Sequence, residues 1–195
     1  MSIIDRAVAA VTPPESQEAR EKARDRATEC AQPGDWLSVV LDHHRQIEAA
    51  FAAVKSTDDA GSRVTALKKL GVVLTGHAIA EESVLYPGLA QDGEKGHADM
   101  GYTEQAMVKM QMAQLESLVP MSQDFLDKLE HIRGAVAHHM YEEEGTWFPE
   151  LKQKASAEIQ TKLTKRFVEE FDRYVGRNPP ARPEPALQSR SWVEA

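Results

Sequence analysis

One stretch of the sequence occurs twice, and this internal repeat constrains the fold more than any other feature. Residues of the first copy recur 62 positions later, so that Leu67, Leu70, Leu74, His77, Glu81, Leu85 and Pro87 correspond to Leu129, Ile132, Val136, His139, Glu143, Trp147 and Pro149. Steps of three and four residues place each set on one face of a helix. The helix before each copy also recurs, because the spacing around His44 matches that around Gln105. The repeated unit is therefore a pair of helices.

Two copies of a helix pair predict an all-α fold, an antiparallel up-down four-helix bundle with extra N- and C-terminal helices. Alternating β-branched residues and Asn-Gly turns, which are typical of strands and hairpins, are absent from the sequence. We expect four regions along the chain: an N-terminal helical extension (1–34), the bundle (35–152), a C-terminal amphipathic helix (153–176) and a proline-rich tail (177–195).

The helix expected near the C-terminus carries a strong apolar stripe, formed by Ile159, Leu163, Phe167, Phe171 and Tyr174. Such a stripe buries itself against another element. It predicts either packing on the outside of the bundle or a homodimer interface through the terminal helices, and the sequence does not separate the two.

Charge and composition exclude several classes of protein. The 195 residues include 23 Lys and Arg against 31 Asp and Glu, and a net charge of −8 argues against nucleic acid or an anionic membrane as a partner. No apolar run approaches the ~20 residues that span a bilayer, and the first residues lack the basic region of a signal peptide. A single cysteine, Cys30, excludes cysteine-based zinc and iron–sulfur sites. We expect a cytoplasmic protein.

The repeated His and Glu residues carry the chemistry. His77 and Glu81, like His139 and Glu143, are four residues apart and share the apolar face of their helix. An ionised side chain inside a bundle is costly without a compensating charge. Imidazole and carboxylate together suit iron, manganese or zinc. The pattern therefore predicts a buried metal site, with a salt-bridged structural pair as the alternative.

The first bundle helix offers a further ligand. His44 lies on its inward stripe, whereas His43, about 100° away around the helix, points aside to the surface or behind the ligands. We interpret Glu82 and Glu144, which follow the repeated glutamates, as solvated positions on the helix flank. The alternative is that they accept hydrogen bonds from ligating imidazoles.

Three segments carry a family resemblance: His44-Arg-Gln-Ile-Glu-Ala-Ala-Phe51, His77-Ala-Ile-Ala-Glu81-Glu82-Ser-Val-Leu-Tyr-Pro87 and His139-Met-Tyr-Glu-Glu143-Glu144-Gly-Thr-Trp-Phe-Pro149. They resemble the hemerythrin-like, or HHE cation-binding, domain over roughly residues 35–152. The resemblance implies a non-haem centre of two iron ions, oxo- or hydroxo-bridged, inside four antiparallel helices. The ligands that it implies here are His44, His77, Glu81, His139 and Glu143, with the two glutamates as bridging carboxylates.

One position departs from the family pattern, because Gln105 stands where the family has a histidine on the third helix. Gln105 binds through its amide oxygen, or leaves the position to water, or yields it to the phenolate of Tyr102, one turn earlier on the same face. We favour Tyr102 or an open position over Gln105. An incomplete histidine set fits turnover or sensing better than reversible oxygen transport.

The resemblance implies a small diatomic or peroxide ligand, and we hypothesise a role in handling O2, NO or peroxide. Three classes of function remain open. An iron or redox sensor predicts stable ligand adducts, and an enzyme with peroxidase- or oxidase-like activity predicts turnover. A structural domain with one metal ion, such as zinc, predicts neither. The sequence does not identify a catalytic residue.

Overall fold

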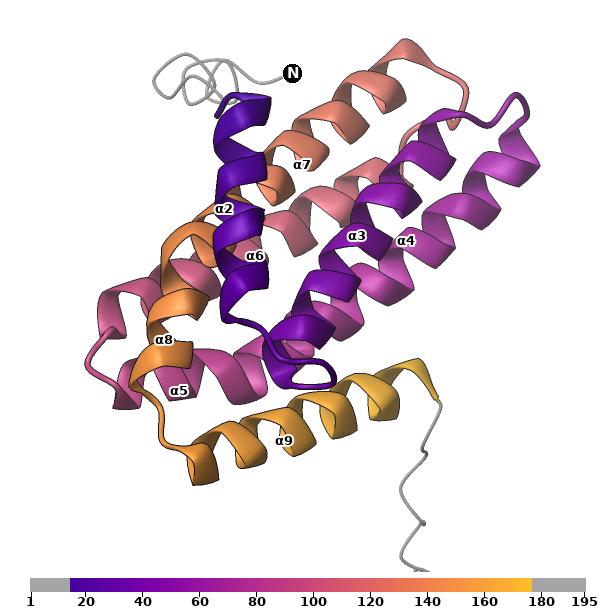
Figure 1. Ribbon diagram of the computed structural model, residues 1–195. Coiled ribbons are helices and arrows are strands. Elements are labelled where there is room, and N and C mark those ends of the chain that lie inside the picture. The colour runs from indigo at the N-terminus through magenta and orange to yellow at the C-terminus, as the bar shows by residue number, and fades with distance from the viewer. Residues whose placement is uncertain (1–14, 177–195) are drawn as a thin grey trace, which may run out of the picture.

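A computed structural model describes residues 15–176, and this part of the chain is helical with no strand. Figure 1 shows its helices with the labels used below. They are α2 (Gln17–Cys30), α3 (Trp36–Lys55), α4 (Ala60–Ala80), α5 (Tyr86–Gln91), α6 (Lys95–Glu116), α7 (Gln123–Glu142), α8 (Phe148–Lys154) and α9 (Ala157–Val175), with two π-helical turns, η1 (Glu81–Leu85) and η2 (Glu143–Trp147). The predicted all-α fold is confirmed.

The four long helices α3, α4, α6 and α7 form the bundle, with their axes roughly aligned in Figure 1. Each packs against two of the others, so that the contacts close a ring in the order α3, α4, α6 and α7. The first and last described helices lie outside this ring. α9 crosses one end of the bundle and packs on α3 and α4, while α2 packs on α3, α7, α8 and η2.

Side-chain caps explain where several helices begin. Asp35, Asp59, Ser122 and Ser156 each accept a hydrogen bond from the backbone N–H three residues later, at the starts of α3, α4, α7 and α9. These bonds satisfy donors that the first helical turn leaves free. Gly176 caps the end of α9, and its φ of 79° is the left-handed conformation that glycine adopts without strain.

The apolar core is divided into two clusters, and buried polar residues lie between them. One cluster contains Trp36, Tyr86, Trp147 and Phe148, and the other contains Phe51 and its neighbours. On α3 the boundary falls at His44, between Leu41 and Ile47, and on α4 it falls at His77, between Leu74 and Ala80. The bundle therefore positions a polar layer at the middle of its core.

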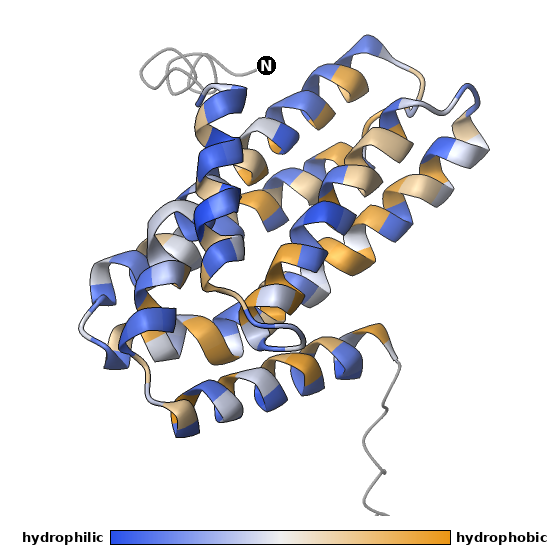
Figure 2. Cartoon of the chain, in the orientation of Figure 1, coloured by the Kyte–Doolittle hydropathy of each residue, from blue (hydrophilic) through white to orange (hydrophobic). Residues whose placement is uncertain are grey.

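α9 turns its apolar stripe toward the bundle, as Figure 2 shows. Leu163, Phe167 and Phe171 are buried within this chain, whereas Ile159 and Tyr174 remain more than 40% exposed. The middle of the stripe is therefore covered by the bundle itself, which was one of the two predicted arrangements.

The two copies of the repeat both contain a π-helical turn at the same place. η1 and η2 begin at Glu81 and Glu143, the glutamates of the repeated pairs, and end just before Tyr86-Pro87 and Phe148-Pro149. We expected the helices to end near these prolines, but the chain continues as α5 and α8, because a proline is tolerated in the first turn of a helix. π-helical turns occur frequently at functional sites.

No helix among residues 15–176 is both long and apolar enough to span a membrane. The segments 1–14 and 177–195, which include the expected proline-rich tail, lie outside the described residues.

Asp35 links the start of α3 to α8 and makes stability depend on pH. Burial raises its pKa, but hydrogen bonds from Lys152, Ser38 and Gln32 outweigh burial and hold the pKa below the ordinary 3.8. Because the folded state binds this proton more weakly than the unfolded chain, the stabilisation is present at neutral pH and is lost as the pH falls through the folded pKa.

We predict that Asp35→Asn lowers the free energy of unfolding at pH 7 by about 1 kcal/mol or less, and that this difference from wild type shrinks in acid. Urea denaturation at pH 7, 5 and 3.5 measures it. A difference that stays constant over this range would contradict the role of the charge.

Candidate metal centre

Four buried residues from four elements of the bundle converge on one point. His44 on α3, His77 on α4, Glu81 on η1 and Glu143 on η2 each offer one donor atom, and these atoms all lie within 4.8 Å of one another. None of the four residues is more than 3% exposed. This group is called the four-donor cluster below.

The atoms that face one another in this cluster lack hydrogen-bond partners. Nε2 of His77 lies 3.1 Å from Oε1 of Glu81, and Nε2 of His44 lies 3.4 Å from Oε2 of Glu143. Neither contact has hydrogen-bond geometry, and within residues 15–176 these four atoms have no other hydrogen-bond partner. Buried polar atoms are normally paired, and leaving them unpaired is costly.

The donor set fits a metal ion. Two imidazole nitrogens and two carboxylate oxygens are a nitrogen and oxygen set suited to iron, manganese or zinc. An ion would satisfy all four unpaired atoms at once and neutralise the two buried carboxylates. The chain therefore contains a candidate metal site, formed by four of the five residues that we expected as ligands from the sequence.

The other oxygen of each carboxylate faces a second group, formed by Tyr86, Gln105 and His139. Oε2 of Glu81 accepts a hydrogen bond of 2.6 Å from Gln105 Nε2. Oε1 of Glu143 accepts one of 3.0 Å from the Tyr86 hydroxyl and lies 3.3 Å from His139 Nε2. Glu81 and Glu143 thus lie between two halves of one site, with one oxygen of each directed to either half.

Tyr86 occupies the centre of the second half, and sequence reasoning missed it. Its hydroxyl lies 3.0 Å from His139 Nε2 and accepts a 2.7 Å hydrogen bond from Gln105 Nε2. The ring fits because α6 carries Gly101 beside it, where a Cβ atom would lie 2.7 Å from the ring. One signal was available, since the second copy of the repeat has Phe148 at this position, without a hydroxyl.

Gln105 lies deeper in the site than Tyr102, although we favoured Tyr102 or an open position over Gln105 as a ligand. Gln105, which we ranked lower, is buried and directed into the site, and its Oε1 lacks a hydrogen-bond partner within residues 15–176. Tyr102 is 38% exposed and donates its hydroxyl proton to the backbone carbonyl of Glu82, 2.8 Å away. It contacts the site only through its ring, which packs edge-on against Tyr86. The expectation that Tyr102 is a ligand is therefore not supported by its position.

Carboxylates behind the histidines orient two of the rings. His44 donates from Nδ1 to Glu144 at 2.8 Å, and His139 donates from Nδ1 to Glu104 at 2.8 Å. Such bonds fix the tautomer and direct Nε2 toward a metal. Glu144 is 2% exposed, so our interpretation of it as a solvated residue was wrong. Glu82 lies on the flank as expected, where it pairs with Lys109.

His43 is buried, which agrees with the second of the two positions that we expected, behind the ligands rather than at the surface. The centroid of its ring lies 3.9 Å from the centroid of the Phe171 ring and 5.7 Å from the centroid of the His77 ring. It therefore lies behind a candidate ligand, where α9 covers it.

The buried charges shift one another's pKa values. Burial opposes protonation of His44, but Glu143 and Glu144 outweigh it and raise the pKa of His44 to about 9. Burial and the neighbouring histidines hold the pKa of His77 well below its ordinary value. Burial and the charge of Glu143 raise the pKa of Glu81, while His139 and His44 overcome burial to lower that of Glu143. The two glutamates therefore differ in their affinity for a proton.

Comparison with known proteins gives one family and one relative. The sequence matches the Hemerythrin HHE cation binding domain over residues 37–175, which includes α9 as well as the bundle. A protein named DNA nickase, from Nostoc sp. (strain PCC 7120 / SAG 25.82 / UTEX 2576), is 26% identical over 133 residues. That alignment covers 68% of this chain and 37% of the relative, so the chain spans little more than a third of that protein.

No solved structure matches this sequence. The family match nevertheless covers well over half of the chain and all of the residues in both halves of the site. A buried cluster of His and Glu side chains at the middle of a four-helix bundle agrees with a cation-binding role. The chain belongs to the hemerythrin HHE cation-binding domain family.

Proposed function

We propose that this protein binds iron in the four-donor cluster and uses it to bind, or react with, O2, NO or peroxide. The observation that carries the proposal is the set of four unpaired donor atoms on His44, His77, Glu81 and Glu143. Iron at such a site supplies an electron-transfer centre with room for a small ligand. The chain supplies the donors and a water-poor surrounding.

The second half of the site supports a second ion, held more weakly than the first. His139 and the outer oxygens of Glu81 and Glu143 are suitable donors there, and Oε1 of Gln105 is a further one. In contrast to the four-donor cluster, these oxygens already accept hydrogen bonds from Tyr86 and Gln105. A second ion must break those bonds, so we propose two iron ions of unequal affinity.

A cavity beside the site favours a small uncharged ligand. It has a volume of about 200 Å³ and is lined by His77, Gln105 and His139 together with apolar side chains, among them Ile47, Leu74, Val108, Met112, Val136 and Met140. The exposed Glu116 also lines it, so the cavity reaches the surface. Lys109 and Glu116 are charged, but most of the lining is apolar, which suits O2, NO or hydrogen peroxide better than a larger polar ligand.

Sensing and catalysis remain two forms of this proposal. A sensor holds its ligand as a stable adduct, whereas an enzyme turns peroxide or NO over repeatedly. A cytoplasmic location and a homodimer formed through the terminal helices are further parts of the proposal. The net charge of −8 disfavours DNA as a partner, so the activity in the relative's name is not carried to this chain.

Replacing ligands tests the assignment of the first ion. We predict that His77→Ala and Glu143→Ala each lower the iron bound per chain, because each removes one of four donors. Elemental analysis after dialysis measures the loss. His131→Ala and Glu82→Ala, which alter residues outside the cluster, serve as matched controls and should keep the wild-type content. Full metal content in both ligand variants would show that the site is wrongly assigned.

A spectrum tests the second ion and the reaction. We expect the iron-loaded protein to show near-ultraviolet charge-transfer bands that change when peroxide is added.

Gln105→His places an imidazole in the second half of the site and should raise the iron occupancy of the weaker position. An ion count below two that this variant leaves unchanged would favour a single-metal site. Zinc alone, without visible absorption, would favour the structural alternative.

A further inference from the structure

The helix α2 lies outside the family match, yet it packs directly on the π-helical turn that carries two residues of the site. The match begins at residue 37, whereas α2 spans Gln17–Cys30. Arg26 donates a 2.7 Å hydrogen bond to the carbonyl oxygen of Gly145, in the middle of η2. The Cβ of Ala23 lies 3.4 Å from the point where a Cβ on residue 145 would stand. α2 and η2 are therefore in close contact.

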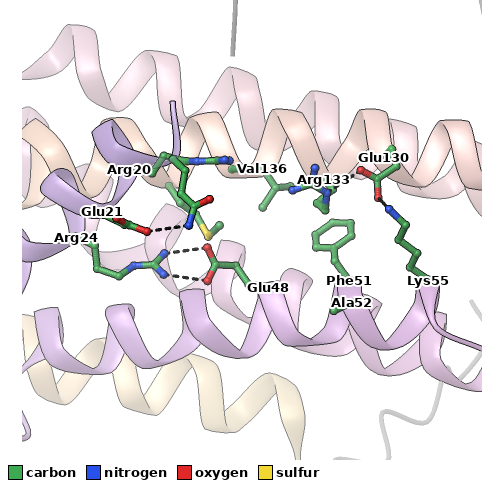
Figure 3. A pocket seen from close by; sticks show the side chains of 13 residues that line it. Arg20, Glu21, Arg24, Glu48, Phe51, Ala52, Lys55, Glu130, Arg133 and Val136 are labelled. Carbon is green, nitrogen blue, oxygen red and sulfur yellow. Dashed lines mark hydrogen bonds and ion pairs between the residues drawn. The ribbon is translucent and has the colours of Figure 1, made fainter. Parts of the chain in front are cut away.

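Arg24 projects from α2 between two carboxylates. Its Nε lies 3.2 Å from both oxygens of Glu144, and its Nη2 lies 3.1 Å from Oε1 of the same residue. Its two terminal nitrogens also donate to Glu48 on α3, at 2.9 and 3.0 Å, and Figure 3 shows this pair. The planar guanidinium thus binds each carboxylate through paired contacts, which fixes direction as well as distance.

Glu144 transmits this contact to the site. The oxygen that Arg24 binds most closely, Oε1, also accepts the 2.8 Å hydrogen bond from Nδ1 of His44. With one proton held at Nδ1, the proton that a cation displaces is the one on Nε2, the atom that faces the four-donor cluster. Glu144 is 2% exposed and follows Glu143 in the chain, so its negative charge is costly to bury. The guanidinium of Arg24 compensates this charge.

The internal repeat provides a comparison within the same chain. Glu82 is the counterpart of Glu144, and Gln105 is the counterpart of His44, so the carboxylate–imidazole contact has no equivalent in the repeat, and Glu82 pairs with Lys109 on the flank. Nδ1 of His77 has no hydrogen-bond partner within residues 15–176. Of the two imidazoles in the four-donor cluster, the one held by a carboxylate is therefore His44, and Arg24 of α2 binds that carboxylate.

Arg24 is also accessible from outside the bundle. It lines, with Glu48 and Arg20, a cavity of about 420 Å³ between α2, α3 and α7, which Figure 3 shows from close by. α2 can therefore affect His44 from the surface, because the contact between Arg24 and Glu144 connects the cavity wall to the buried ring.

We propose that α2 is a working part of the metal site, and that Arg24 is a positioning residue that holds Glu144 against His44 and so directs Nε2 toward the metal. The inference rests on the proposed metal site and deepens it. A segment outside the family domain thus contributes to the affinity for the first ion.

Titration with Co2+ in competition with a chelator tests the proposal, using the full chain. Arg24→Met keeps most of the side-chain stem but removes the guanidinium. We expect it to lower the affinity for the first ion about 10- to 100-fold, the usual effect of losing a group that orients a ligand. Arg20→Met, on the same helix and the same cavity, is the matched control and should change the affinity less than twofold.

Three further variants separate positioning from general loosening of the helix. Arg26→Met weakens the docking of α2 without touching Glu144, so we expect a smaller loss of affinity than with Arg24→Met. The double variant of Arg24→Met and Glu144→Gln should bind Co2+ about as weakly as whichever of the two single variants binds it more weakly, because both changes act on the imidazole of His44.

Three outcomes would overturn the proposal: wild-type affinity in Arg24→Met, an equal loss in Arg26→Met, or additive losses in the double variant. Failure of wild type itself to bind Co2+ would instead overturn the proposed function. Circular dichroism of the metal-free variants confirms that each one is folded before it is titrated.

Discussion

The structure depends on one unfavourable feature, the burial of Glu81 and Glu143 among three histidines at the middle of an apolar bundle. Each glutamate directs one oxygen to an imidazole without a hydrogen bond and the other to Tyr86 or Gln105. Burying charges in this way is costly unless something compensates them. Hydrogen bonds from Tyr86 and Gln105 reduce the cost of burial on one side of the two glutamates. On the other side, four donor atoms remain for a cation. The two halves of the site therefore differ, although the helices that carry them are repeated.

That difference between the halves has identifiable sources. Tyr86 is replaced by Phe148 in the second copy, so a hydroxyl enters the site from one copy alone. Gln105 stands in the second copy where the first has His44, and it donates a hydrogen bond to Glu81. Glu144 and Glu82, at equivalent positions, face the interior and the flank respectively. A repeat that arranges four helices symmetrically thus carries a site whose two halves have different donors and different supporting groups.

Much of the fold and most of the cluster could be predicted from spacing alone. Leu74, His77 and Glu81 lie on one face because the helix repeats every 3.6 residues, and burial of that face follows from its apolar neighbours. The same counting holds through η1 and η2, where Leu85 and Trp147 are buried as predicted, but spacing alone does not reveal that these turns are π-helical. The burial of Glu144 and the position of Tyr86 depend on contacts with α2 and α6, and these contacts join residues far apart in the sequence.

Anomalous X-ray diffraction from crystals of the iron-loaded protein tests most directly whether the four-donor cluster holds the first metal ion. We expect the strongest peak at the iron edge among Nε2 of His44, Nε2 of His77, Oε1 of Glu81 and Oε2 of Glu143. A weaker peak beside His139 would agree with a second ion of lower affinity. Strong iron peaks elsewhere, with none among these four atoms, would contradict the account.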